Sequence, residues 1–168
     1  MIPAVRELEK VCSFLNARAV QYLAIGGLAV AAHGYTRMSM NESGQILEKP
    51  DLDFWYNPTY DNYFRLIDVL EDLGKEVKIF RDEQTPDPLH SFFRYQFPHF
   101  TLDFLPSIKL QLKFREAYDR KFELDVGGFI LPVISYDDLL KDKIAASRPK
   151  DISDIEALKR FPRIDGDL

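Results

Sequence analysis

The sequence predicts an α+β fold, a mixed α/β arrangement in which strands and helices follow one another and helices occupy both ends. An apolar stripe at helical spacing begins the chain, and acidic and apolar residues alternate over 51–56. A glycine pair separates two short apolar runs over 122–133, which is typical of a hairpin. At 168 residues, the chain is expected to form a single domain over 1–168.

In the first half of the chain, the spacing of apolar residues predicts the elements. Glycine and proline mark the ends of several of them, because both interrupt regular structure. The elements expected here are a helix over 3–19, a buried strand over 22–25, a short helix over 28–33, a loop or small hairpin over 38–50, a strand over 51–56, a helix over 60–73 and a strand over 77–80.

Turn-forming residues divide the second half in the same way. Two prolines predict a loop over 82–89, and Gly127-Gly128 predicts a hairpin turn. Ser135 is a favourable N-cap, with Asp138 at the capping-box position. The other expected elements are strands over 91–97 and 100–105 joined tightly at 98–99, a short helix or irregular segment over 109–118, hairpin strands over 122–126 and 129–133, a helix over 135–147 and a last helix from 149 or 150 that ends before 162.

The composition favours some compartments and partners over others. The single Cys12 excludes an internal disulfide and fits a reducing compartment, and the N-terminus lacks the apolar stretch of a signal peptide. No apolar run is long enough to span a bilayer, so we expect a cytoplasmic protein without membrane contact. A formal net charge of −5 does not favour nucleic acid as a partner.

Gly26-Gly27 and Asp51-Leu52-Asp53 are the residues most informative about chemistry. A glycine pair between a strand and a helix lets backbone N–H groups approach a phosphate closely. Two aspartates separated by one residue on a strand face the same side, so both can hold one divalent cation. Metal and phosphate sites side by side are typical of phosphoryl or nucleotidyl transfer. The alternative is a solvent-facing strand edge and an ordinary glycine turn.

Asp103 is a third candidate, because it stands alone among apolar residues of the strand expected over 100–105. A carboxylate in such surroundings is costly unless it faces solvent, a partner or a metal. With Asp51 and Asp53 it could supply oxygen ligands to one or two Mg²⁺ ions and help to deprotonate an incoming hydroxyl. A structural or solvated carboxylate is the alternative.

The order of these features resembles the nucleotidyltransferase superfamily, whose minimal fold is polymerase-β-like. The features are the glycine pair, a short helix, the Asp-x-Asp strand and a later acid. The segment GGLAVAAHGYTR and the tail LLKDKIAASRPKDISDIEAL are similar to a bacterial branch of uncharacterised nucleotidyltransferases and toxin components of abortive-infection systems. The resemblance covers 22–158 and implies a nucleotidyltransferase-like mixed sheet flanked by helices.

The resemblance also implies a role for individual residues. It assigns catalysis and metal binding to Asp51, Asp53 and Asp103, and nucleotide binding to Gly26, Gly27, Arg37 and Lys143. The loop over 38–50 is longer than in that branch, which leaves the role of Arg37 open between a phosphate contact and none.

Charged residues near the C-terminus have a second interpretation. Lys143 could equally lie on a solvated helix face. A salt-bridge cluster at the start of the last helix is favoured over catalysis for four other residues, which are Arg148, Lys150, Asp151 and Asp154.

The function expected is transfer of a nucleoside monophosphate (NMP) from a nucleoside triphosphate (NTP) to a hydroxyl, with Mg²⁺ or Mn²⁺ as cofactor. Small molecules, proteins and RNA are all acceptors in the superfamily. The alternative is a non-catalytic nucleotide-binding or partner-binding module of a toxin–antitoxin-like system, in which a cognate protein is the partner.

Overall fold

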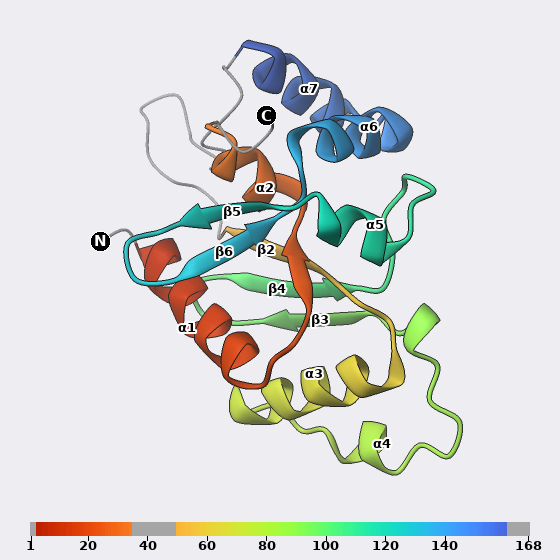
Figure 1. The fold of residues 1–168 in the computed structure, drawn as a ribbon. Coiled ribbons are helices and arrows are strands. Elements are labelled where there is room, and N and C mark those ends of the chain that lie inside the picture. Colours follow the sequence, from red (N-terminus) through yellow and green to blue (C-terminus); the bar gives the residue numbers. More distant parts are fainter. Residues whose placement is uncertain (1–2, 35–49, 161–168) are drawn as a thin grey trace.

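The computed structural model describes residues 3–34 and 50–160. Within these residues, six strands form one sheet in the order β3-β4-β2-β1-β6-β5 (Figure 1). The pairs β1–β6 and β2–β4 are parallel and the other pairs antiparallel, so the sheet is mixed as expected. The strands are β1 (Tyr22–Ala24), β2 (Asp51–Tyr56), β3 (Phe93–Gln96), β4 (Thr101–Leu105), β5 (Phe122–Asp125) and β6 (Ile130–Val133).

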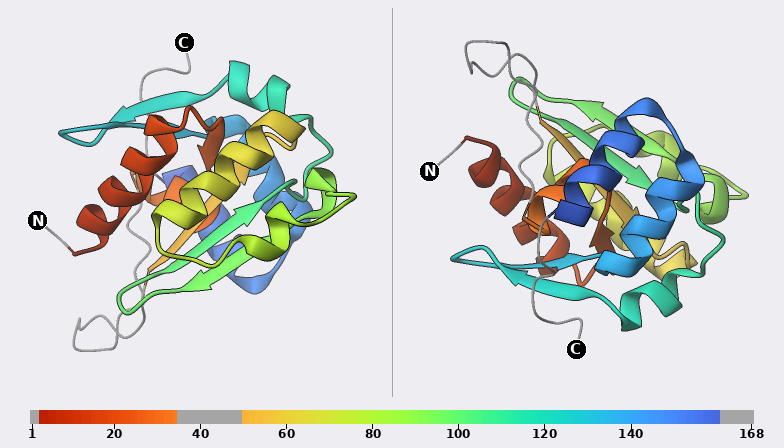
Figure 2. Two further views of the ribbon diagram at one scale, coloured as in Figure 1. Left: turned by 90° about the horizontal axis from the view of Figure 1, so that it is seen from below. Right: turned by 90° about the horizontal axis from the view of Figure 1, so that it is seen from above.

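Helices cover both faces of this sheet (Figure 1). Seen from below, α1 and α3 lie side by side over one face, and seen from above, α2, α6 and α7 lie over the other (Figure 2). The helices of the described residues are α1 (Pro3–Ala17), α2 (Gly26–Ala32), α3 (Tyr60–Asp72), α4 (Lys78–Arg81), α5 (Phe114–Asp119), α6 (Tyr136–Ala146) and α7 (Pro149–Arg160), with a 3-10 turn over Pro88–His90. No helix among them is long and apolar enough to cross a membrane.

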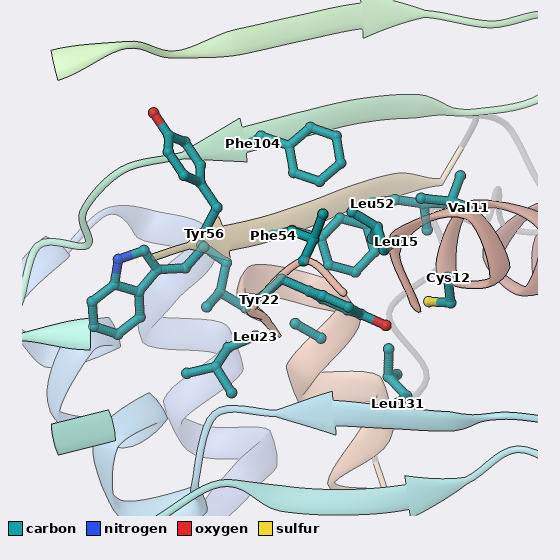
Figure 3. Packing of buried hydrophobic residues seen from close by; sticks show 14 of the residues in the cluster. Val11, Cys12, Leu15, Tyr22, Leu23, Leu52, Phe54, Tyr56, Phe104 and Leu131 are labelled. Atoms are coloured by element: carbon teal, nitrogen blue, oxygen red, sulfur yellow. The ribbon is translucent and has the colours of Figure 1, made fainter. Parts of the chain in front are cut away.

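Aromatic side chains of the central strands form much of the core between the sheet and α1 (Figure 3). The rings of Phe54 and Phe104 stack with centroids 5.5 Å apart, and Tyr22 meets Phe54 edge-on. On the opposite face of β2, Trp55 packs edge-on against Phe114 of α5. Trp55 and Tyr56 are fully buried and belong to the core.

Most predicted elements are confirmed, but the strand expected over 77–80 is wrong. Residues 78–81 form α4, in which Val77 and Phe80, three positions apart, both turn inward. Phe80 contacts Phe93, whereas Ile79 between them is 72% exposed. In a segment of only four residues, helical spacing cannot be told from strand alternation. Residues 77–80 (V-K-I-F) fit both the helical period of 3.6 and the strand period of 2. Helix α2 also begins earlier than expected, at Gly26 itself.

One buried amide joins the start of β1 to the end of β2. Asn62 of α3 is 1% exposed, and its Oδ1 accepts a hydrogen bond from the backbone N–H of Gln21 at 2.7 Å. Its Nδ2 donates to the carbonyls of Gln21 at 3.0 Å and Asn57 at 2.8 Å. The helix therefore holds both strand ends by one side chain.

Replacing Asn62 by alanine leaves these backbone groups without their partner, and such groups cost about 1–3 kcal/mol when buried. We expect Asn62→Ala to lower the free energy of unfolding by about 2–3 kcal/mol, measured by urea denaturation. Arg65→Ala, on the exposed side of the same helix, should stay within about 0.5 kcal/mol of wild type. Equal losses in the two variants would contradict the structural role of Asn62.

Candidate active site

A cavity of about 570 Å³ opens where β1, β2 and β4 face the helices α6 and α7. The glycine pair and all three acids singled out in the sequence line it. The charged and glycine residues of its wall are Gly26, Gly27, Asp51, Asp53, Arg94, Asp103, Lys109, Asp142, Lys143, Arg148, Lys150 and Asp151. The structure therefore brings together residues from both ends of the chain.

The register of β2 against β4 places the acids. These parallel strands pair Asp53 with Asp103 and Asp51 with Thr101. Leu52 and Phe54 point into the core from the other face of β2, so both aspartates face the cavity. Asp51 is exposed and accepts a hydrogen bond from the Thr101 hydroxyl, whereas Asp53 is half-buried and Asp103 is 8% exposed.

Gly26 lies directly against the carboxylate of Asp53. Its φ is +60°, in the left-handed region that favours glycine, and a Cβ there would lie 2.7 Å from Asp53 Oδ2. The backbone N–H of Ile25 donates to the Asp53 carbonyl at 3.0 Å. The glycine turn and the Asp-x-Asp strand therefore form one unit, with no room for a larger residue between them.

The environment of Asp53 disfavours its charge. Burial is the main cause that raises its pKa to about 6; the nearby carboxylates of Asp103 and Asp51 contribute to the rise, and Lys150 opposes it. Desolvation and like charge are the conditions under which a carboxylate gains most from a cation.

Arg94 is a cavity residue that the sequence analysis missed. From β3 it donates through Nε to Asp103 Oδ1 at 3.0 Å and through Nη2 to Asp103 Oδ2 at 2.9 Å. The two residues are direct cross-strand neighbours. The tight connection predicted at 98–99 could have revealed this pair. If Phe97 pairs with Phe100, counting three residues back along one strand and three forward along the other places Arg94 opposite Asp103.

Lys143 is buried, so a solvated helix face is wrong for it. Its Nζ lies 3.3 Å from Asp151 Oδ1 and 3.0 Å from Asp154 Oδ2, which joins α6 to α7. Arg148 donates two further side-chain hydrogen bonds to Asp151. Burial opposes ionisation of Asp151, but these bonds, the Arg148 backbone N–H and Lys143 together lower its pKa to about 2. The salt-bridge cluster expected at the start of the last helix is present for these residues.

Lys150 departs from that cluster. It is exposed, lines the cavity, and its charge acts on Asp53. Lys150 is therefore a cavity residue that can offer a positive charge to an incoming anion, although the sequence favoured the salt-bridge cluster for it. Arg37, expected to contact phosphate, and residues 38–49 of the expected loop lie outside the described residues.

The carboxylates of the cavity are better suited to binding a single Mg²⁺ than to enclosing several ions. Among residues 3–34 and 50–160, no group of three or more His, Cys, Asp or Glu side chains is arranged to hold a metal ion. Mg²⁺ is commonly bound by one or two carboxylates together with water and substrate phosphates. Asp51 and Asp53 offer such a pair, and a cation there would offset the like charges around Asp53.

The raised pKa of Asp53 predicts how metal-free stability depends on pH. Since the folded pKa of about 6 exceeds the ordinary value of 3.8, the stability that Asp53 contributes is fully present below about pH 4 and is lost as the pH rises through about 6. Asp53→Asn cannot ionise, so it should be more stable than wild type in EDTA at about pH 7.5 and lose that advantage near pH 4. Urea unfolding at each pH measures this, with exposed Asp125→Asn as control. A wild type more stable than Asp53→Asn at neutral pH would contradict it.

The close approach at Gly26 predicts a specific loss. Gly26→Ala and Gly74→Ala both force alanine to a positive φ, which costs about 1–2 kcal/mol. Only Gly26→Ala also places a methyl group against Asp53, because nothing lies within 4 Å of the position at Gly74. We expect Gly26→Ala to destabilise the protein more than Gly74→Ala in urea denaturation. Equal losses would mean that Asp53 moves aside without cost.

No protein-family model matches the chain, and no curated protein matches it by sequence. The crystal structure of the lincosamide antibiotic adenylyltransferase LnuA, bound to lincomycin, is similar with a TM-score of 0.60 and 19% identity, covering 94% of this chain and 97% of that one.

Two structures of ANT(2″)-Ia are similar as well. The solution structure of this antibiotic-resistance factor gives a TM-score of 0.58 at 16% identity, covering 94% of this chain and 83% of that one. The crystal structure of ANT(2″)-Ia in complex with adenylyl-2″-tobramycin gives 0.56 at 18% identity, covering 94% and 88%. The likeness to the abortive-infection branch stays a prediction. The resemblance to the nucleotidyltransferase superfamily is confirmed in architecture, and this chain has the nucleotidyltransferase fold.

Proposed function

We propose that this protein is a metal-dependent nucleotidyltransferase that moves an NMP from an NTP to a hydroxyl of a small acceptor. The observation that carries the proposal is the contact of Gly26 with Asp53 inside the cavity, beside Asp51. This contact places a backbone suited to phosphate next to carboxylates suited to a cation. Two aspartates on an ordinary solvent-facing strand would need neither a positive-φ glycine against them nor a cavity.

Asp51 and Asp53 are the residues that would hold Mg²⁺ or Mn²⁺. Such an ion, when bound, neutralises charge on the phosphates and orients them for displacement. The first backbone N–H groups of α2, which begins at Gly26, have no acceptor within the helix, and Gly26 and Gly27 line the cavity. These groups and the ammonium of Lys150 would bind the triphosphate. Lys143 already holds Asp151 and Asp154, so its contribution to phosphate binding would be indirect, by keeping α7 in place.

Asp103 is the residue that would receive a proton. The acceptor oxygen would attack the α-phosphorus, the bond from that phosphorus to the α,β-bridging oxygen would break, and pyrophosphate would leave. The hydroxyl proton would pass to a carboxylate oxygen of Asp103. Arg94 uses two lone-pair positions of this carboxylate, which has about four, so an acceptor hydroxyl can still bind there.

The acceptor we propose first is a small hydroxyl-bearing molecule. The net charge of −5 does not favour RNA. The similar structures are those of enzymes described with lincomycin and with adenylyl-2″-tobramycin, which are both small molecules. A cognate protein partner and a toxin role would follow from the abortive-infection resemblance alone and have no support in the described structure.

Nucleotide binding tests the donor site. Isothermal titration with ATP, CTP, GTP and UTP, each with Mg²⁺ and with EDTA, should show metal-dependent binding of at least one NTP. Asp51→Asn/Asp53→Asn should lose this binding by at least about tenfold, because each carboxylate removed weakens the ion that holds the phosphates. Asp125→Asn, exposed and outside the cavity, should bind as wild type does. A well-folded wild type that binds no NTP would favour the non-catalytic module.

Transfer itself is tested with acceptors. The protein is incubated with the NTP that binds, Mg²⁺ and either lincomycin or an aminoglycoside, and the acceptor is examined by mass spectrometry for the added NMP. Asp103→Asn should lower the rate by about 10²–10⁴-fold while nucleotide affinity changes little, since a general base contributes to the transition state and not to donor binding. Unchanged turnover in Asp103→Asn would remove Asp103 from the reaction.

A further inference from the structure

We propose that Arg94 takes the place of a second metal ion, so that this protein works with one divalent cation at Asp51 and Asp53. The inference rests on the proposed function and deepens it. Two-metal sites place a second cation about 3.5–4 Å from the first, between the carboxylates and the reacting oxygens. Here the third carboxylate of the cavity already has a positive partner that belongs to the chain itself.

The geometry of the Arg94–Asp103 pair is that of a complete ion pair. The guanidinium meets both carboxylate oxygens at 3.0 and 2.9 Å, in the parallel arrangement that gives such pairs their strength and direction. The side chain of Asp103 is 11% exposed, so this ion pair is partly shielded from solvent. A second cation at these oxygens would lie beside the guanidinium charge of Arg94, and like charges repel.

The position of Arg94 is supported from a second side. Its guanidinium carbon lies 5.3 Å from the ring centroid of Phe92, an exposed aromatic residue of the cavity wall. A cation over an aromatic face at this distance is attracted to the ring. Phe92 and Asp103 therefore hold the guanidinium from two directions, at the mouth of the cavity.

The remaining donors of Arg94 can serve the substrate. A guanidinium has five N–H groups, and the two bonds to Asp103 leave about three of them. These point from a side chain that is 62% exposed and lines the cavity, where the phosphates of an NTP are proposed to bind. Arginine thus supplies the positive charge that a second ion would otherwise bring.

Asp51 and Asp53 differ from Asp103 because, within residues 3–34 and 50–160, neither is paired with an arginine. Asp51 accepts a hydrogen bond from the uncharged hydroxyl of Thr101, and Asp53 lies against Gly26. Neither has a bidentate arginine among the hydrogen bonds of the described residues. The cavity therefore divides its acids into a pair that suits a cation and one that is already neutralised.

The test counts the Mn²⁺ ions held by each chain by native mass spectrometry, in the complex with the α,β-methylene analogue of the NTP that binds. Wild type should bind one ion per chain. Arg94→Gln should bind two, because the freed Asp103 joins the acids, and Arg94→Lys should stay at one. Arg120→Gln is the matched control, since Arg120 holds Asp138 by the same two nitrogens but outside the cavity, and it should also bind one.

Two results would contradict this inference, and they can be told apart. Two ions in wild type, or one ion in a folded Arg94→Gln, would overturn the role of Arg94 while the nucleotidyltransferase proposal stands. A wild type that binds neither Mn²⁺ nor the nucleotide analogue would overturn the proposed function and, with it, this inference. Circular dichroism of each variant keeps loss of folding apart from loss of binding.

Discussion

The parallel pairing of β2 with β4 is the constraint on which the rest of the site depends. Its register puts Asp53 beside Asp103 and Asp51 beside Thr101, while Phe54 and Phe104 stack on the other face. A shift of one residue would turn every side chain of one strand to the opposite face, with acids in the core and aromatic rings in solvent. The same aromatic contacts that stabilise the core therefore specify where the carboxylates meet. Stability and chemistry are encoded in alternate residues of the same two strands.

Much of the fold could be predicted from local pattern. The Gly127-Gly128 hairpin, the cap at Ser135 and the long amphipathic helices depend on neighbours in sequence, and the structure confirms them. The strand predicted over 77–80 was wrong, because four residues fit both the helix period and the strand period. Only the contact between Phe80 and the distant Phe93 decides between the two. Strand order could not be predicted in this way, since the pairing of β1 with β6 joins residues about a hundred positions apart.

The residues of the site also differ in whether the local sequence was enough to find them. Gly26, Asp51 and Asp53 were found because their residue types and spacing are informative on their own, and they lie together in the cavity. Arg94 was missed because an arginine in an amphipathic strand is unremarkable until its cross-strand partner is known. For Lys143 the sequence could not show burial, which depends on two carboxylates of the following helix. Charge pairing across elements is a property of the fold, and single positions do not carry it.

One wall of the cavity is made by α6 and α7, the last described elements of the chain, whereas Asp51, Asp53 and Asp103 come from β2 and β4. During synthesis the aspartates therefore leave the ribosome long before Lys143 and Asp151 can join the two helices over them. β1 also waits, since β6 is its parallel neighbour in the sheet. A nascent chain thus carries three carboxylates with no enclosing wall, and the cavity is complete only when the C-terminal helices dock. Translation and completion of the cavity are in this way separated in time.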